Sequence, residues 1–269
     1  MNSYSATTPT ARAPPLQFGR TASEVSVPNP QTALTRKLAT FVALSDEDRA
    51  MLDRLHQRRR SFAAGVDLVH QGQPDQSAYI LAKGWACSYK LLPNGARQIV
   101  DFQIPGDFLG LRSILFRTAD HNIEPITPVE ASEVIVTDLL EAFAKTPRLA
   151  TAVLWAASRD EAMVVEHLVG IGRRNALERT AHYLLELGAR LKLVGLGSND
   201  GYDCPLSQYM LADALGLSAV HINRVLRQLR EMGLLTFQKG YVNIEDFDSL
   251  VALADFDTAY LDHDGPLLK

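Results

Sequence analysis

The sequence has little cysteine, and its two thiols, Cys87 and Cys204, lie far apart and outside any CxxC spacing. This usage argues against a disulfide framework and against a thiolate metal site. It is typical of a protein kept in a reducing compartment, so we expect a cytoplasmic location. Cys87 lies in a strand-like run and fits a core thiol, whereas an oxidant-sensing role for Cys204 stays open.

Long hydrophobic runs are also missing. No stretch of the sequence approaches the roughly 18 consecutive apolar residues of a membrane-spanning helix, so we expect no membrane partner. The N-terminus has no apolar core of the kind that marks a secretory signal. With 46% hydrophobic and 22% charged residues, the composition is that of an ordinary globular protein, long enough for two domains with separate cores.

An excess of positive charge is absent as well, since the formal net charge is −4. The charge is unevenly distributed: residues 241–264 carry seven acids and no lysine or arginine, and without these acids the net charge would be +3. Residues 221–240 hold four basic side chains against one acid. Because local charge governs contact with phosphates, the acidic total does not exclude nucleic acid as a partner.

The most informative segment present, residues 206–244, predicts a helix, a glycine turn, a second helix and a short hairpin. Ser207 and Ser218 suit the N-caps of the two helices, and Gly216 lies where the chain must turn with positive φ. The apolar face of the first helix is predicted to contain Leu211, Ala212 and Leu215. The stripe of the second follows offsets 0, +3, +4 and +7, at Ile222, Val225, Leu226 and Leu229.

The opposite face of the second helix carries the side chains with DNA-binding chemistry. At about 100° per residue, Val220, Arg224 and Arg227 point away from the apolar stripe, with His221 and Asn223 at its flanks. Arginine can bridge the O6 and N7 atoms of guanine, and valine can contact a thymine methyl group. This arrangement favours a recognition helix in a DNA major groove.

A hairpin directly after this helix strengthens that interpretation. Residues 234–237 and 241–244 flank Gln238-Lys239-Gly240, as in winged helices. Without the hairpin, a solvated helix pair at the edge of another domain would fit the pattern equally well. The candidate DNA contacts are Ser207, Gln208, Ser218, Val220, His221, Asn223, Arg224, Arg227 and Lys239. Of these, Ser207, Arg227 and Lys239 suit the phosphate backbone.

Upstream, residues 61–138 alternate glycine turns with short apolar runs spaced about 8–12 residues apart, which indicates a β-roll or barrel. The runs are Asp67–Val69, Ala78–Leu81, Ala86–Tyr89, Gln98–Phe102 and Val134–Val136. Pro93-Asn94-Gly95 is typical of a hairpin turn. Such a roll either encloses a cavity or packs a solid core, and periodicity does not decide between the two.

A long helix is predicted from Pro147 to about Arg173, and another from Asn175 to Leu193. Positions near 3.5-residue spacing in the long helix are Val153, Ala157, Asp160, Val164, His167 or Leu168, and Ile171. This spacing fits a coiled-coil seam between two subunits and also one face of an ordinary amphipathic helix. Asp160 is an unfavourable charge for a seam.

A β-roll, a long helix and a winged helix, in that order, resemble the Crp/Fnr family of bacterial transcription regulators over about residues 36–248. The most specific matches are residues 106–110 (GDFLG) in the roll and 211–224 in the helix-turn-helix. Residues 172–179 and 218–224 are similar to a branch common in alphaproteobacteria. The resemblance implies a homodimer joined along the long helix, a palindromic site in double-stranded DNA, and contact with RNA polymerase.

The resemblance also implies which family ligands this chain lacks. Cyclic-AMP-binding members carry Glu just after the GDFxG segment and an Arg-Ser pair further on, where this chain has Leu111 and residues 120–123 (DHNI). Without a phosphate clamp, we expect no cyclic nucleotide. Oxygen-sensing members hold an iron–sulfur cluster with four cysteines, mostly near the N-terminus. No cysteine precedes Cys87, so the cysteine count excludes that cluster.

An unidentified effector stays open. The candidate effector pocket is formed by Phe108, Leu109, Gly110, Leu111 and Arg112. A haem ligand among His56, His70 and His121 is not excluded, although lone histidines are more often structural. The recognition helix departs from the family as well: many members have Glu at the position of Val220, whereas Arg224 matches the base-contacting arginine. We therefore expect a different half-site.

The predicted fold class is α+β, with an N-terminal β-roll like the cyclic-nucleotide-binding jelly roll, a long dimerisation helix and a C-terminal winged helix-turn-helix. The expected parts are a disordered arm (1–35), a β-roll sensor domain (36–145), the dimerisation helix (146–173), the DNA-binding domain (174–248) and an acidic C-terminal tail (249–269).

Three classes of function fit these features to different degrees. The leading hypothesis is a homodimeric, sequence-specific transcription regulator, and the alternative is a small-molecule-binding sensor module in which the roll is the main functional part. A cupin-like enzyme would need clustered His and carboxylate ligands on the roll strands. Residues 61–138 contain only His70 and His121, so we expect no enzyme activity, no catalytic residues and no metal site.

Overall fold

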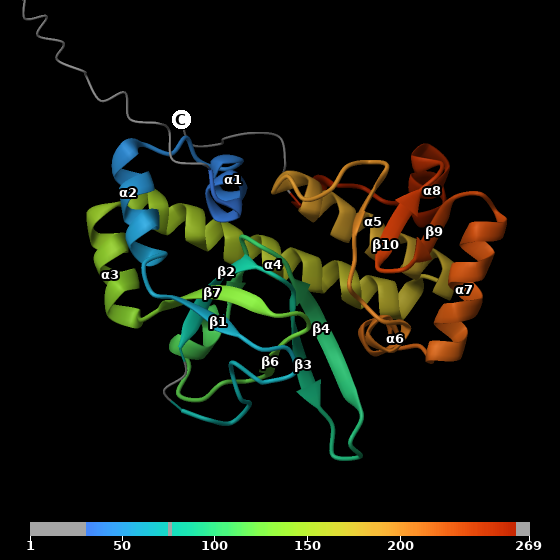
Figure 1. Ribbon diagram of the computed structural model, residues 1–269, viewed down its shortest axis with the longest axis horizontal. Coiled ribbons are helices and arrows are strands. Elements are labelled where there is room, and N and C mark those ends of the chain that lie inside the picture. The colour runs from blue at the N-terminus through green and yellow to red at the C-terminus, as the bar shows by residue number, and fades with distance from the viewer. Residues whose placement is uncertain (1–30, 75–76, 262–269) are drawn as a thin grey trace, which may run out of the picture. The chain divides into compact units, whose positions relative to one another are not determined.

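The computed structural model describes residues 31–74 and 77–261 (Figure 1). Two short helices come first, α1 (Ala33–Ala39) and α2 (Asp46–Leu55). The strands of the β-roll are β1 (Arg59–Phe62), β2 (Ala78–Lys83), β3 (Ala86–Leu91), β4 (Arg97–Gln103), β5 (Phe108–Leu109), β6 (Asn122–Pro125) and β7 (Val129–Val134). The roll also contains the 3-10 helix η1 (Leu111–Ile114), and α3 (Val136–Lys145) follows it.

The roll is built from two antiparallel sheets. One has the strand order β1-β7-β2-β5 and the other β4-β3-β6. Apolar side chains from both sheets meet between them, among them Leu81 and Ala131 from the first sheet and Ala86 and Ile123 from the second. Burial of these side chains holds the two sheets together, so the roll contains a packed apolar core.

Two predicted strands need correction. Residues 67–69 form no strand, because Gly65 and Gly72 turn the chain on either side with φ of +77° and +82°, and only Val69 pairs, in a bridge with Ile123. The predicted run 134–136 is a strand only at Val134, after which α3 begins. The helix α3 begins with β-branched residues, which favour a strand, but the strong helix formers at residues 139–145 outweigh this preference.

α1 begins inside the segment predicted as a disordered arm. Thr32 caps it, since the Thr35 N–H donates to the Thr32 side-chain oxygen over 3.2 Å. Leu34 and Leu38 are buried against the apolar cluster that α2 and α4 share. Residues 33–35 are therefore helical, and residues 1–30 of the predicted arm lie outside the described residues.

Two long helices follow the roll, α4 (Pro147–Arg173) and α5 (Ala176–Leu193). The bounds of α4 are those that the sequence predicted, with Pro147 in its first turn. Only Arg174 and Asn175 separate the two helices, and Arg174 has an extended backbone. Asn175 starts α5 with a capping box, in which its side chain and that of Glu178 satisfy each other's backbone N–H groups.

The C-terminal part is a helix-turn-helix with a three-stranded wing in the order β8-β10-β9. Its elements are β8 (Gly201–Asp203), α6 (Gln208–Leu215), α7 (Ala219–Glu231), β9 (Leu235–Gln238), β10 (Tyr241–Ile244), α8 (Phe247–Ala254) and the 3-10 helix η2 (Ala259–Leu261). The last two correct the predicted acidic tail: α8 lies beside α5 (Figure 1), and residues through Leu261 belong to the packed structure.

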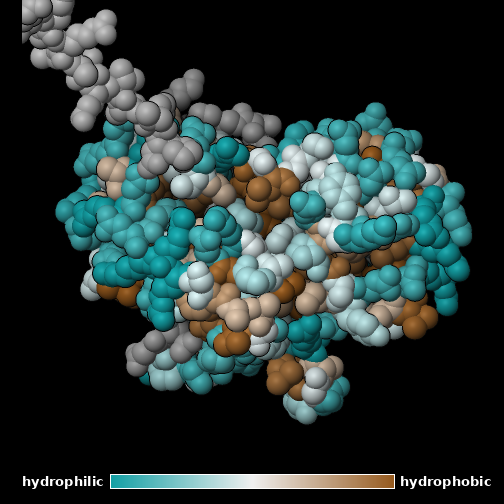
Figure 2. All heavy atoms as spheres, in the orientation of Figure 1, coloured by the Kyte–Doolittle hydropathy of each residue, from teal (hydrophilic) through white to brown (hydrophobic). Residues whose placement is uncertain are grey.

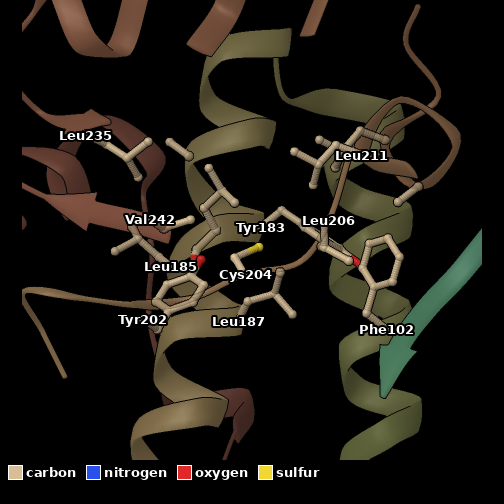
Figure 3. Packing of buried hydrophobic residues seen from close by; sticks show 14 of the residues in the cluster. Phe102, Tyr183, Leu185, Leu187, Tyr202, Cys204, Leu206, Leu211, Leu235 and Val242 are labelled. Atoms are coloured by element: carbon tan, nitrogen blue, oxygen red, sulfur yellow. The ribbon is translucent and has the colours of Figure 1, made fainter. Parts of the chain in front are cut away.

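The C-terminal core extends into the roll. Figure 3 shows Tyr202, Cys204 and Val242 packed around Leu185 and Leu187 of α5, with Phe102 of β4 beside Tyr183. The rings of Phe102 and Tyr183 meet edge to face, with centroids 6.1 Å apart. Because this apolar cluster is continuous, the helix-turn-helix packs directly against the β4 side of the roll.

Candidate nucleic-acid interface

The helix-turn-helix forms as its sequence predicts. Ser207 and Ser218 cap α6 and α7, and each side-chain oxygen accepts a backbone N–H over 3.2 Å, from Met210 and His221 respectively. Gly216 has φ of +62°, and its N–H donates to the carbonyl of Ala212, which ends α6. The structure buries the predicted apolar faces of both helices, at Leu211, Ala212, Leu215, Ile222, Val225, Leu226 and Leu229.

The opposite face of α7 is exposed. Val220 has 72% of its surface accessible, and Asn223, Arg224 and Arg227 are exposed beside it, while His221 is half-buried. In Figure 2 hydrophilic residues cover the right-hand edge of the molecule, over α7. The cationic face of α7 is thus accessible while its apolar face is held against the core.

The arginines of this face are available for a ligand. Arg227 lies 3.7 Å from Glu231, and both side chains are more than 60% exposed. An exposed pair of this kind contributes between 0 and about 1 kcal/mol, so it dissociates readily. The Ser207 and Ser218 hydroxyls accept backbone N–H groups, which leaves each O–H free to donate to a phosphate oxygen.

The wing places a lysine at its tip. Gln238 pairs with Tyr241, so the turn consists of Lys239 and Gly240, with φ of +52° and +76°. Two successive positive φ values define a type I′ turn, the two-residue turn whose twist matches a hairpin. A left-handed backbone costs a non-glycine residue about 1 kcal/mol. At Lys239 this conformation places a positively charged side chain at the tip of the hairpin.

The predicted effector residues do not face one cavity. Phe108 packs in the cluster of α1 and α2, whereas Leu109 packs in the core of the roll. Gly110 turns the chain with φ of +64°, Leu111 is half-buried against the same cluster as Phe108, and Arg112 is exposed. An effector site at these residues stays a prediction.

The position where the resemblance expects a phosphate clamp holds a balanced charge cluster. Asp120 accepts from Nδ1 of His121 over 2.6 Å and lies 3.5 Å from Arg112. Burial, followed by the effect of Arg112, lowers the pKa of His121 although Asp120 opposes the shift. The Asp120 carboxylate neutralises the nearby cation and would repel an anionic ligand.

The three candidate haem histidines are dispersed. Nδ1 of His56 lies 3.3 Å from the Ser132 hydroxyl, and burial lowers the pKa of His56. His70 lies 3.4 Å from the carboxylate of Asp67. Within residues 31–74 and 77–261, no group of three or more His, Cys, Asp and Glu side chains is arranged to hold a metal ion.

No sequence pattern predicted the polar contact between the roll and the helix-turn-helix. Arg97 of β4 donates to Asp213 of α6 over 2.7 Å and also contacts Glu124 at 3.3 Å. The Gln98 amide donates to the carbonyl of Ala214. The partners in the two contacts with α6 are 116 residues apart in the chain, and no local pattern encodes such a pairing.

A buried charge network was also missed. Arg190 of α5 donates to Asp101 and Asp107 over 2.9 Å each, and Lys37 of α1 donates to Asp107 over 2.8 Å. Burial alone would raise the pKa of Asp107, but Lys37 and Arg190 hold it well below its ordinary value. Removal of one partner from such a network costs about 3–5 kcal/mol. Asp107, a residue of the GDFLG segment, thus connects three parts of the chain.

The face of α4 that remains exposed agrees with the predicted seam only in part, at Val164, Leu168 and Ile171. Val153 and His167 are turned into their own chain, and Asp160 lies 3.8 Å from Lys37. The exposed apolar residues of α4 are Leu154, Val164, Val165, Leu168, Val169 and Ile171. We call these six the α4 stripe. It contains the predicted positions 164, 168 and 171 and extends to residues 154, 165 and 169, which the seam did not include.

Comparison with known proteins gives two family matches. Residues 178–253 match the Crp-like helix-turn-helix domain and residues 59–146 match the cyclic nucleotide-binding domain. Among the described helices, none is long and apolar enough to cross a membrane.

Individual relatives match over most of their length. The nitrogen fixation regulation protein FixK of Bradyrhizobium diazoefficiens is 31% identical over 198 residues, which cover 73% of this chain and 82% of that protein. The transcriptional activatory protein AadR of Rhodopseudomonas palustris is 29% identical, over 81% of this chain and 90% of AadR. The solved structure of FixK2 from Bradyrhizobium japonicum has a TM-score of 0.65 at 27% identity and covers 72% of this chain and 96% of that one.

Proposed function

The chain belongs to the Crp/Fnr family of transcription regulators, and from this premise we propose that it binds a palindromic DNA site as a homodimer. The observation that carries the proposal is the division of α7 into a buried apolar stripe and an exposed face with Val220, Arg224 and Arg227. A helix held in this way can enter a major groove without exposing its core.

Within this proposal the nine candidate residues have separate roles. Arg224, Val220, Asn223 and His221 read base edges, since they lie on the accessible face of α7 or at its flank. Ser207, Gln208, Ser218, Arg227 and Lys239 contact phosphates from the starts of both helices and the tip of the wing. Because Val220 replaces a hydrogen-bonding acid, a thymine methyl is the group we expect it to contact.

The α4 stripe is the surface we propose for the dimer. Leu154 and Leu168 are 67% and 70% exposed, and apolar side chains so placed on a long helix are stabilised by burial against a second helix. A two-fold axis along α4 would present two recognition helices to successive turns of one duplex. The half-site centres should then lie about 10 base pairs apart.

The proposal also covers location, partner and chemistry. The protein acts in the cytoplasm, where its DNA lies, and it contacts RNA polymerase as the family resemblance implies. It has no enzyme activity. Any effector of the roll is not a cyclic nucleotide, since Asp120 and His121 stand where a phosphate clamp would be needed. The apolar core of the roll favours the regulator over the alternative of a sensor module.

Selection of bound sequences from a random pool of duplex DNA tests the proposal. We expect an enriched palindrome whose half-sites are one helical turn apart. A pool that stays unenriched would count against specific recognition, and an enriched single half-site would count against the dimer.

A further inference from the structure

Residues 255–261, here called the strap, follow α8 and lie beyond the residues that match the helix-turn-helix domain. Asp255 reverses the chain with φ of +46°, and its N–H donates to the carbonyl of Val251. Phe256 is 9% exposed and Leu261 is fully buried. The strap is thus an addition to the matched domain that packs back onto the same chain.

The strap contacts α5 through an aromatic cluster and a buried acid. The rings of Phe256 and Tyr260 lie 5.0 and 6.0 Å from His182, the first edge-on and the second stacked. The Tyr260 hydroxyl donates to a carboxylate oxygen of Glu186 over 2.8 Å. Glu186 has no exposed surface, so this hydrogen bond forms away from solvent, where it is strongest.

The strap also contacts α4. Nε of Arg159 donates to the carbonyl of Leu261 over 2.8 Å, and Arg159 is 4% exposed. The other carboxylate oxygen of Glu186 lies 2.9 Å from Nε2 of His167, which belongs to α4. Residues of the strap, α4 and α5 therefore form one connected set of buried polar contacts.

The angle between α4 and α5 matters because each helix serves a different part of the protein. α4 carries the stripe proposed for the dimer, and α5 packs against α7. Only Arg174 and Asn175 connect the two helices. In a dimer, the angle at this junction sets the distance between the two recognition helices.

We propose that the strap fixes this angle and that Tyr260 and Phe256 are positioning residues for the recognition of two half-sites. The inference rests on the proposed function. It requires that loss of the strap contacts weakens the simultaneous binding of two half-sites by a dimer. The binding of one α7 to its own half-site should not change.

Two strap variants and one control test this requirement. Tyr260→Phe removes one hydrogen bond, and the double variant Phe256→Ala, Tyr260→Ala removes the aromatic cluster around His182. Tyr79→Ala is the control: Tyr79 is 7% exposed and meets Phe62 edge to face at 5.6 Å, so its loss also removes a buried ring, but one in the apolar cluster of the roll, which contains no strap residue.

The DNA probes are the palindrome enriched from the random pool, its single half-site, and palindromes with one base pair added or removed between the half-sites. If only about a tenth of the molecules of a strap variant keep the required angle between α4 and α5, affinity for the palindrome should fall about tenfold. Half-site affinity should stay within about twofold, and the penalty for altered spacing should shrink. Unchanged palindrome binding, or equal loss on palindrome and half-site, would overturn the inference.

Amide hydrogen exchange of the full chain tests the strap without DNA. In the double variant, the amides of residues 174–180 should exchange about tenfold faster than in the wild type, with no such change in Tyr79→Ala. Unchanged exchange at these residues would refute the strap's role. If the wild type enriches no sequence while exchange responds as expected, the proposed function fails and the strap's restraint on the junction stands.

Discussion

Among single residues, Arg224 has the most direct consequence for sequence recognition. It is exposed on the face of α7 opposite the buried stripe. We expect Arg224→Ala to cost about 1–3 kcal/mol on the specific site and to relax base preference at one position, since a bidentate contact with guanine contributes about that much. Binding to operator variants with each base at that position measures the effect.

The matched control for Arg224 is Arg227, a second exposed arginine one turn further along α7. Because a phosphate contact carries no sequence information, Arg227→Ala should weaken all sequences alike and reduce the salt dependence of binding. Equal loss for Arg224→Ala on specific and random DNA would assign it to the phosphate backbone instead.

The two thiols give a second prediction at this scale. Cys87 and Cys204 are buried, and burial raises the pKa of each thiol to about 12. Since the thiolate is the reactive form, neither should react with a maleimide or disulfide reagent at pH 7.5 until the protein unfolds. Rapid native-state modification of Cys204 would restore the oxidant-sensing role that its place beside the helix-turn-helix had left open.

Individual residues were predictable where their role is local. Ser207, Ser218 and Gly216 were assigned to caps and a turn because those functions depend on neighbours within four residues. Arg97 and Asp213 were not predictable as a pair, because only the folded chain brings β4 to α6. The buried state of Arg190 was hidden for the same reason: arginine is a surface residue by default.

At the scale of elements, the junction of α4 and α5 predicts a pH dependence of stability. Burial alone would lower the pKa of His167, but the Glu186 carboxylate raises it above the ordinary value. A raised histidine pKa stabilises the fold fully below the unfolded pKa of about 6.5. This contribution is lost as the pH rises through the folded pKa. We expect the contribution of His167 to the free energy of unfolding to decline from about pH 6.5 upward.

His167→Gln is the matched variant and should abolish this decline. Burial lowers the pKa values of His56, His121 and His182, so near pH 6.5 the unfolded state binds more protons at these three, and they add a rising slope that wild type and variant share. Denaturant unfolding of both proteins between pH 6.5 and 8.5 measures the difference. Parallel curves for wild type and variant would show that the His167–Glu186 pair contributes nothing to stability in this range.

Helices and strands with a long, regular pattern of apolar residues were predictable from the sequence, and short ones were not. The bounds of α4 followed from Pro147 and 27 residues of helical spacing. β1 was missed because Arg59, Arg60 and Ser61 are exposed on an edge strand, where no apolar alternation is required. The seam on α4 was predicted only in part because a period near 3.5 residues occurs on two faces of this helix, and one face, which includes Val153, packs inside its own chain.

At the scale of the whole molecule, the α4 stripe predicts the oligomeric state. Leu168 is 70% exposed at the centre of the helix face that the chain leaves uncovered. Leu168→Glu places a charge where two apolar helices would meet, and desolvation of an unpaired carboxylate opposes association. We expect a dimer for the wild type and a monomer for the variant in sedimentation equilibrium, at a concentration where the wild type is fully assembled.

The control is Leu140→Glu, because Leu140 is 60% exposed on α3, away from the stripe. It should leave the dimer intact and DNA binding unchanged. Without assembly, Leu168→Glu should bind the palindrome no more tightly than a half-site, since the second contact would no longer benefit from being tethered to the first. A variant that remains dimeric would place the subunit interface elsewhere, and the two recognition helices would then no longer be related by an axis along α4.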